Sequence, residues 1–115
     1  MMQYQQALLM IGLCCGALQA QAASFDCQKA KTSTEHAICA TRSLNDQDVK
    51  MTTMYEIVGH TLAMGGRGAL YDQQRDWLTL RNQCGAKTQC LTTRYQQRID
   101  QLQASLERVY SHGPF

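Results

Sequence analysis

Cysteines are the residues of this 115-residue chain whose spacing bears most directly on chemistry. Two of the six, Cys14 and Cys15, lie in an apolar N-terminal run. The others are Cys27, Cys39, Cys84 and Cys90. Zinc sites use close pairs of the C-x2-4-C type, and a redox dithiol uses C-x-x-C. Neither spacing occurs among the last four, so they favour structural disulfides over a metal site.

The histidines and neighbouring acids do not form a recognisable catalytic pattern. His36, His60 and His112 fall on separate segments, and Asp72 and Asp76 have the i,i+4 spacing of a solvated helix face. A Ser-His-Asp site or a catalytic carboxylate pair needs convergence that these positions do not indicate. We therefore expect a binding protein rather than an enzyme, with no catalytic residues and no cofactor.

A glycine-rich segment, Gly65-Gly66-Arg67-Gly68, is the remaining candidate site. A phosphate-binding loop has the pattern G-x-x-x-x-G-K-[ST] after a strand, and neither the Lys-Ser/Thr pair nor a strand is indicated here. Three glycines within five residues are typical of a helix break. The segment from Met64 to Gly68 is therefore expected to be a flexible loop between two helices.

Residues 1–22 have the pattern of a signal peptide. The run from Ala7 to Leu18 is uncharged and almost wholly apolar, and Ala20 with Ala22 fits an A-x-A-like cleavage site, so cleavage is expected after Ala22. The preceding MMQYQQ lacks the usual Lys or Arg. A membrane anchor is the first alternative, but the run is well short of about 20 residues. Lipidation at Cys14 is the second, and the bulky Leu13 before it disfavours that reading.

Export and cleavage would leave four cysteines in an oxidising compartment, where an even number predicts a disulfide framework. Four cysteines allow three pairings. Local pairing, Cys27 with Cys39 and Cys84 with Cys90, needs the fewest assumptions because each pair brackets a reversal of the chain. Each bond would add roughly 2–4 kcal/mol to a domain too small for a large core.

Apolar residues recur at helical spacing after the leader, which predicts an all-α fold: one domain over residues 23–115, a small bundle of three to four helices. A capping box at Thr32-Ser33-Thr34-Glu35 starts a short first helix. The second is expected to begin with Ser43 as its N-cap. Asp46 and Asp48 would then lie near the positive end of its dipole.

The third helix is expected over about 69–83, closed by Gly85, and the fourth from a Thr88 cap to Gly113-Pro114. Four residues are interpreted as scaffold rather than site: Tyr55, Trp77, Arg81 and Tyr95. The aromatic three would fill the helix-helix core, and Arg81 would pair with an acid or cap carbonyl groups.

Charge excludes some partners. The formal net charge is only +2, and basic and acidic residues are interspersed. This field is too weak to indicate binding to nucleic acid or to an anionic membrane surface.

Two stretches carry a recognisable family pattern. The first comprises Phe25-Asp26-Cys27, Thr32, Glu35, Ala37-Ile38-Cys39, Leu44, Asp48, Met51 and Tyr55. The second comprises Gln74-Arg75, Trp77-Leu78, Arg81-Asn82, Cys84, Cys90-Leu91, Tyr95, Arg98-Ile99 and Leu102. Over nearly all of its length after the leader, the chain resembles the lysozyme-inhibitor LprI-like family. Gln47 departs from the pattern, since an apolar residue is common there.

The resemblance implies a small helical domain of the bacterial envelope with two local disulfides, periplasmic or secreted, that inhibits host-type lysozyme. A lysozyme cleft carries two carboxylates. Under this hypothesis Arg67, flanked by glycines, would reach into the cleft and pair with a carboxylate. The alternatives are an envelope structural or stress-response module, and an immunity-like protein, neither with a lysozyme target.

Overall fold

The computed structural model describes residues 23–112, and every regular element in that range is helical. The elements are a 3-10 turn η1 (Cys27–Lys29), then α1 (Ser33–Ala40), α2 (Arg42–Thr61), α3 (Met64–Gln83) and α4 (Thr88–Ser111). The all-α prediction is confirmed. The predicted leader and the Gly113-Pro114 stop lie outside the described residues. None of these helices is long and apolar enough to cross a membrane.

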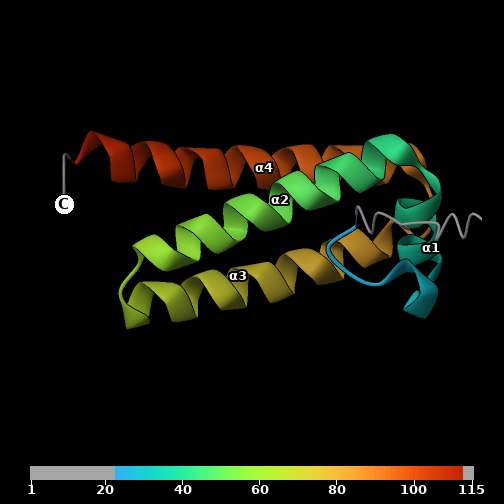
Figure 1. The fold of residues 1–115 in the computed structure, drawn as a ribbon, viewed down its shortest axis with the longest axis horizontal. Helices are drawn as coiled ribbons and strands as arrows, with labels where there is room; N and C mark the ends of the chain where they lie inside the picture. The colour runs from blue at the N-terminus through green and yellow to red at the C-terminus, as the bar shows by residue number, and fades with distance from the viewer. Residues whose placement is uncertain (1–22, 113–115) are drawn as a thin grey trace, which may run out of the picture.

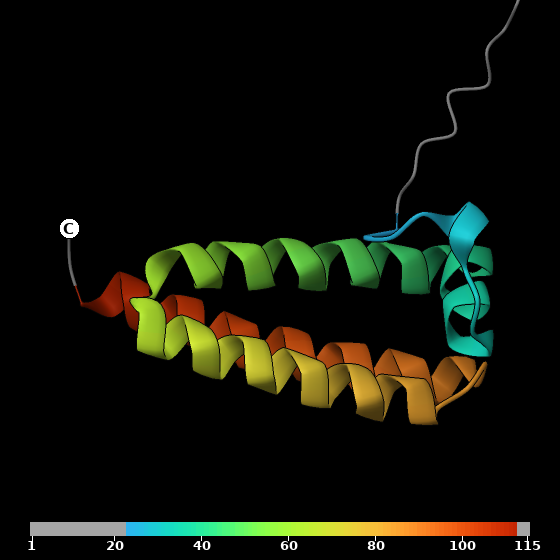
Figure 2. The ribbon, with the colours of Figure 1, turned by 90° about the horizontal axis from the view of Figure 1, so that it is seen from below.

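Three long helices form the bundle, and the short α1 crosses one end of it (Figures 1 and 2). α2 and α4 run in the same direction, and α3 runs the opposite way between them in the chain (Figure 1). The end crossed by α1 therefore holds the start of α2, the end of α3 and the start of α4. The opposite end holds the α2–α3 turn and the end of α4.

The first helix begins as the sequence predicts. The Thr32 hydroxyl accepts the Glu35 N–H at 3.1 Å, and the Glu35 carboxylate accepts the Thr32 N–H at 3.2 Å, which completes a capping box. In the same turn, the buried Thr34 hydroxyl donates to the Gly85 carbonyl at 2.8 Å. Gly85 has φ +57°, the left-handed conformation predicted for it. This bond fixes α1 to the turn between α3 and α4.

Two predicted N-caps are wrong. α2 begins at Arg42 rather than after Ser43, because the single residue Thr41 serves both helices: its N–H donates to Ala37 and its carbonyl accepts from Asn45, each at 3.0 Å. α4 begins at Thr88 itself, with Lys87 as the N-cap residue and no side-chain cap. In both cases the short connection, rather than a capping side chain, sets the start.

The core lies where the inner faces of α2, α3 and α4 meet, and α1 crosses one end of it. Trp77 and Tyr95 form its aromatic centre, with ring centroids 5.1 Å apart in an edge-to-face arrangement. Tyr55 is only partly buried and lies against Tyr71 at the margin. The aliphatic part comprises Ile38, Leu44, Met51, Met54, Val58, Leu70, Leu91, Ile99, Leu102 and Leu106. Phe25 packs partly buried against this core, as expected.

Candidate interaction surface

The glycine-rich segment is helical. Met64 to Gly68 form the first residues of α3, which begins after Ala63 and not near Ala69, so the prediction of a flexible loop is wrong. Helix formation is cooperative, and a long helix can extend through weak helix formers at its first turn. The Arg67 N–H donates to the Ala63 carbonyl at 2.8 Å, which closes this first turn.

The Arg67 side chain folds back onto α2. Its Nε donates to the Gly59 carbonyl at 3.0 Å, and Nη2 donates to the Leu62 carbonyl at 3.3 Å. A guanidinium at the C-terminal end of a helix satisfies carbonyls that lack intrahelical partners and interacts favourably with the dipole. Arg67 therefore joins α2 to α3 and does not project freely from the surface.

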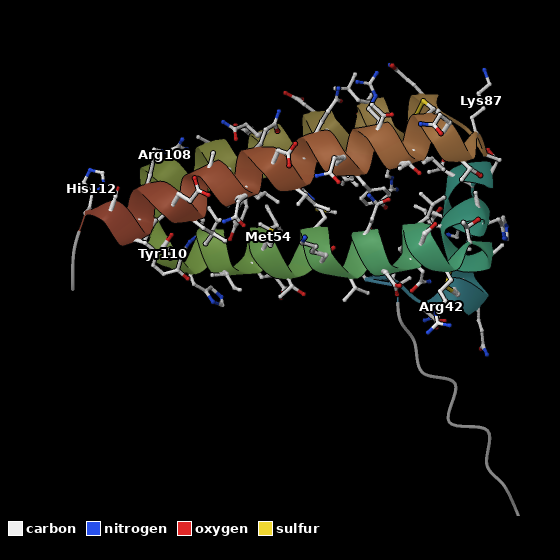
Figure 3. All side chains as sticks on the ribbon, turned by 90° about the horizontal axis from the view of Figure 1, so that it is seen from above. Arg42, Met54, Lys87, Arg108, Tyr110 and His112 are labelled. Carbon is white, nitrogen blue, oxygen red and sulfur yellow. A yellow bond between two sulfur atoms is a disulfide. The ribbon has the colours of Figure 1, made fainter. Side chains whose placement is uncertain are left out.

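Two large apolar side chains are exposed at this end of the bundle. Met64, at the start of α3, is 87% exposed, and Tyr110, near the end of α4, is 73% exposed. Between the two helix ends lies a groove of about 510 Å³ that is lined from α2, α3 and α4 and includes Gly66. Arg108 and His112 also line it, at the C-terminal end of α4 (Figure 3).

We call this region the tip surface and define it by Met64–Gly68, Arg108, Tyr110 and His112. Its glycines leave it open: a Cβ at Gly65 or Gly68 would meet no atom within 4 Å. The groove is lined by two basic side chains and by no carboxylate. The tip surface thus combines exposed apolar groups with the cationic Arg108, a combination suited to contact with a protein surface that carries acidic groups.

A buried polar cluster lies near the other end. Asp48 on α2 is fully buried, and its Oδ1 accepts the Tyr95 hydroxyl at 2.7 Å. Arg81 Nη1 lies 4.0 Å from the same oxygen, and the Ser24 N–H donates to Oδ2 at 2.7 Å. The expectation that Arg81 pairs with an acid is confirmed. Asp48 does not lie in the first turn of α2, where the sequence suggested that it would interact with the dipole, because α2 begins at Arg42 and position 48 faces inward.

Burial and the nearby Asp48 carboxylate raise the pKa of Tyr95 far above its ordinary value, so the phenol stays protonated and serves as a donor.

Arg98 is the second buried cation after Arg81, and its environment is different. Its Nε donates to Gln74 at 2.9 Å, but Nη2 has no partner and no acid pairs with it within residues 23–112. Burial lowers the pKa of Arg98. Both groups belong to the scaffold.

The other candidate groups do not converge. His36, His60 and His112 are exposed and lie on α1, on α2 and at the end of α4. Asp72 pairs with Arg75 on the exposed face of α3. The part of the chain that the structure describes contains no group of three or more His, Cys, Asp or Glu side chains that could hold a metal ion.

The four cysteines form two disulfides, Cys27–Cys39 and Cys84–Cys90, which is the local pairing favoured by the sequence.

A family model described as Lysozyme inhibitor LprI matches residues 26–102, about two thirds of the chain. The chain belongs to this family. Comparison with curated proteins and with solved structures found no match.

The LprI match spans both disulfides, the Met64–Gly68 segment, and Asp48, Arg81 and Tyr95 of the buried cluster, but it begins after Ser24 and ends before Arg108, Tyr110 and His112. Sequence reasoning missed Met64 and Tyr110 as surface groups. A signal for Tyr110 was present in the polar residues around it, Arg108, Ser111 and His112. No such signal existed for Met64, because the segment from Met64 to Gly68 was interpreted as a loop.

Proposed function

We propose that this LprI-family chain is a lysozyme inhibitor that acts outside the cytoplasm after removal of residues 1–22. The observation that carries the proposal is the family match over residues 26–102. Two disulfides in a short chain support an oxidising location, and the apolar run followed by Ala20 and Ala22 supports export. Inhibition would require binding alone, so the absence of convergent catalytic groups among residues 23–112 is compatible with it.

The contact surface in this proposal is the tip surface. Met64 and Tyr110 would provide apolar anchors, the open glycines would allow close approach, and Arg108 would approach the acidic cleft of the hydrolase. Arg67 acts differently from the sequence hypothesis. Its bonds to the Gly59 and Leu62 carbonyls hold the turn in place, so it positions Gly65, Gly66 and Gly68 for contact.

The test is the loss of turbidity of a cell-wall suspension with c-type, g-type and i-type lysozymes, each with and without the oxidised chain from Ala23. We expect stoichiometric inhibition of one class. Met64→Ala combined with Tyr110→Ala should weaken it at least tenfold, and Arg67→Ala should do the same by loosening the turn. Ile57→Ala and Leu80→Ala remove apolar groups exposed elsewhere and should leave the inhibition constant unchanged.

Each part of the proposal can fail separately. If no lysozyme class is inhibited at tens of micromolar, inhibition is not the activity of this chain, and an envelope module becomes the better interpretation. If inhibition is present but the Met64 and Tyr110 double variant inhibits as well as the unaltered chain, the activity stands and the tip surface is the wrong face.

A further inference from the structure

The start of the described chain lies against a buried carboxylate. Ser24 donates its backbone N–H to Asp48 Oδ2 at 2.7 Å, and the preceding residue, Ala23, is itself buried. The other oxygen, Oδ1, faces Tyr95 and Arg81. The two oxygens therefore have separate surroundings, and Oδ2 faces the N-terminal segment.

Backbone geometry limits how far the Ala23 nitrogen can be from this carboxylate. Successive backbone nitrogens are at most about 3.7 Å apart, given standard bond lengths. With the 2.7 Å bond from Ser24, the Ala23 nitrogen lies within about 6.4 Å of Asp48 Oδ2. An opposite charge at about 4–6 Å is close enough to favour the ionised state of both groups.

The surroundings leave space for an added charge. Ser24 and Asp48 both line a groove of about 650 Å³ between α2 and α3, so an ammonium at this position can keep water on its remaining N–H groups. The groups that contact the carboxylate side chain to side chain are Arg81 from α3 and Tyr95 from α4. The other charged and titratable groups that line the groove are Tyr55 on α2 and Tyr71, Asp72 and Arg75 on α3. Arg81 approaches Oδ1, on the other side from Ser24.

We propose that removal of residues 1–22 completes the Asp48 cluster: the new α-ammonium of Ala23 pairs with Asp48 and stabilises the processed fold. In the cleavage a peptidase of the leader-removing class uses one water. The Ala22–Ala23 C–N bond breaks, Ala22 receives the hydroxyl as its new carboxyl group, and the Ala23 nitrogen takes the hydrogen and a further proton from solvent. A neutral amide nitrogen, which could not pair with Asp48, thereby becomes a cation.

The experiment compares the oxidised chain from Ala23 with a free amine and the same chain acetylated at Ala23. At pH 6.5 we expect acetylation to lower the Tm by roughly 4 °C or more, the shift that a loss of about 1 kcal/mol gives in a domain of this size. A chain that starts at Ala22 moves the ammonium one residue outward and should fall between the two. With Asp48→Asn, the free and acetylated chains should melt together.

A second measurement does not depend on a variant that folds. NMR titration of the Ala23 amine in the unaltered chain should give a pKa above the value of the same amine in urea, since the carboxylate favours the charged form. Equal melting of the free and acetylated chains, together with an amine that titrates as in urea, would overturn the proposal. So would an intact mass of the exported protein that shows a start other than Ala23. None of these outcomes depends on lysozyme inhibition.

Discussion

The hydroxyl of Tyr95 donates a 2.7 Å hydrogen bond to Oδ1 of Asp48 and so joins α4 to α2 across 47 residues of sequence. Both residues are fully buried. A buried carboxylate is tolerated only where donors and cations surround it. Tyr95 and Arg81 provide them on one oxygen and Ser24 on the other, so three segments of the chain must be in place together before Asp48 can enter the core.

Replacing Tyr95 with Phe should cost about 1.5–3 kcal/mol of unfolding free energy, because a charged acceptor loses its best donor in a site that water does not reach. Urea unfolding followed by far-UV circular dichroism measures this loss. Tyr110→Phe is the matched control: its hydroxyl is on an exposed side chain, and the change should stay within about 0.5 kcal/mol. Equal effects of the two substitutions would contradict the role given to Tyr95.

The two buried arginines should respond differently to the same substitution. Arg81→Met removes the guanidinium beside Asp48 Oδ1 and should cost about 3 kcal/mol. Arg98→Met removes a guanidinium that has no acid partner within residues 23–112 and whose Nη2 is unpaired, so the cost should be about 1 kcal/mol or less. Thermal and urea unfolding compare them directly. A loss from Arg98→Met as large as that from Arg81→Met would show that the Arg98 hydrogen bonds to Gln74 and Gln101 stabilise the core as much as the ion pair of Arg81 does.

Acid should act partly through the cap of α1. Burial acts to raise the pKa of the Glu35 carboxyl, but hydrogen bonds from Thr32 and the backbone outweigh it and hold the pKa below the ordinary value of 4.5. A carboxyl with a lower pKa in the folded state contributes stability above pH 4.5, and that contribution is lost as the pH falls through the folded pKa. Glu35→Gln should therefore flatten the fall in Tm between about pH 5 and pH 3. Glu56→Gln, at an exposed position of α2, is the control and should keep the slope of the unaltered chain.

Each disulfide should contribute according to its loop. The closed loops correspond to sequence separations of 12 for Cys27–Cys39 and 6 for Cys84–Cys90. Chain-entropy arguments give about 2.8 and about 2.2 kcal/mol for these lengths. Paired Cys→Ala variants test this by chemical unfolding. Because Cys84 is also buried, its pair should lose somewhat more than the loop length predicts, whereas an unchanged midpoint in either variant would contradict a stabilising role.

Local signals predicted the fold well. The capping box at Thr32 and the glycine cap at Gly85 are each readable within a few residues, and both are confirmed. The cysteine pairing was also within reach, because each pair brackets a short reversal of the chain. These features depend on neighbours in sequence, which is the information that a single chain provides.

The errors have physical causes of two kinds. Gly65, Gly66 and Gly68 have low helix propensity, but Arg67 holds the first turn of α3 to the end of α2, so tertiary contacts outweigh the local preference. Asp48 was assigned to the positive end of the helix dipole because its partner Tyr95 is distant in the sequence. Nothing near Asp48 distinguishes a buried carboxylate from a capping one, and only the meeting of α2, α3 and α4 makes the distinction.

Both covalent cross-links lie at the end of the bundle crossed by α1, where Cys27–Cys39 ties η1 to α1 and Cys84–Cys90 ties α3 to α4. At the opposite end, within residues 23–112, side-chain packing and the Arg67 bonds hold the helices together without a disulfide. Amide protons should therefore exchange slowly near the cross-linked end, through global unfolding alone, and faster toward Met64 and Tyr110, through local opening. A partner that binds near Met64 and Tyr110 would bind the conformations in which the helices are packed together at that end. Part of its binding free energy would be used to suppress the local opening.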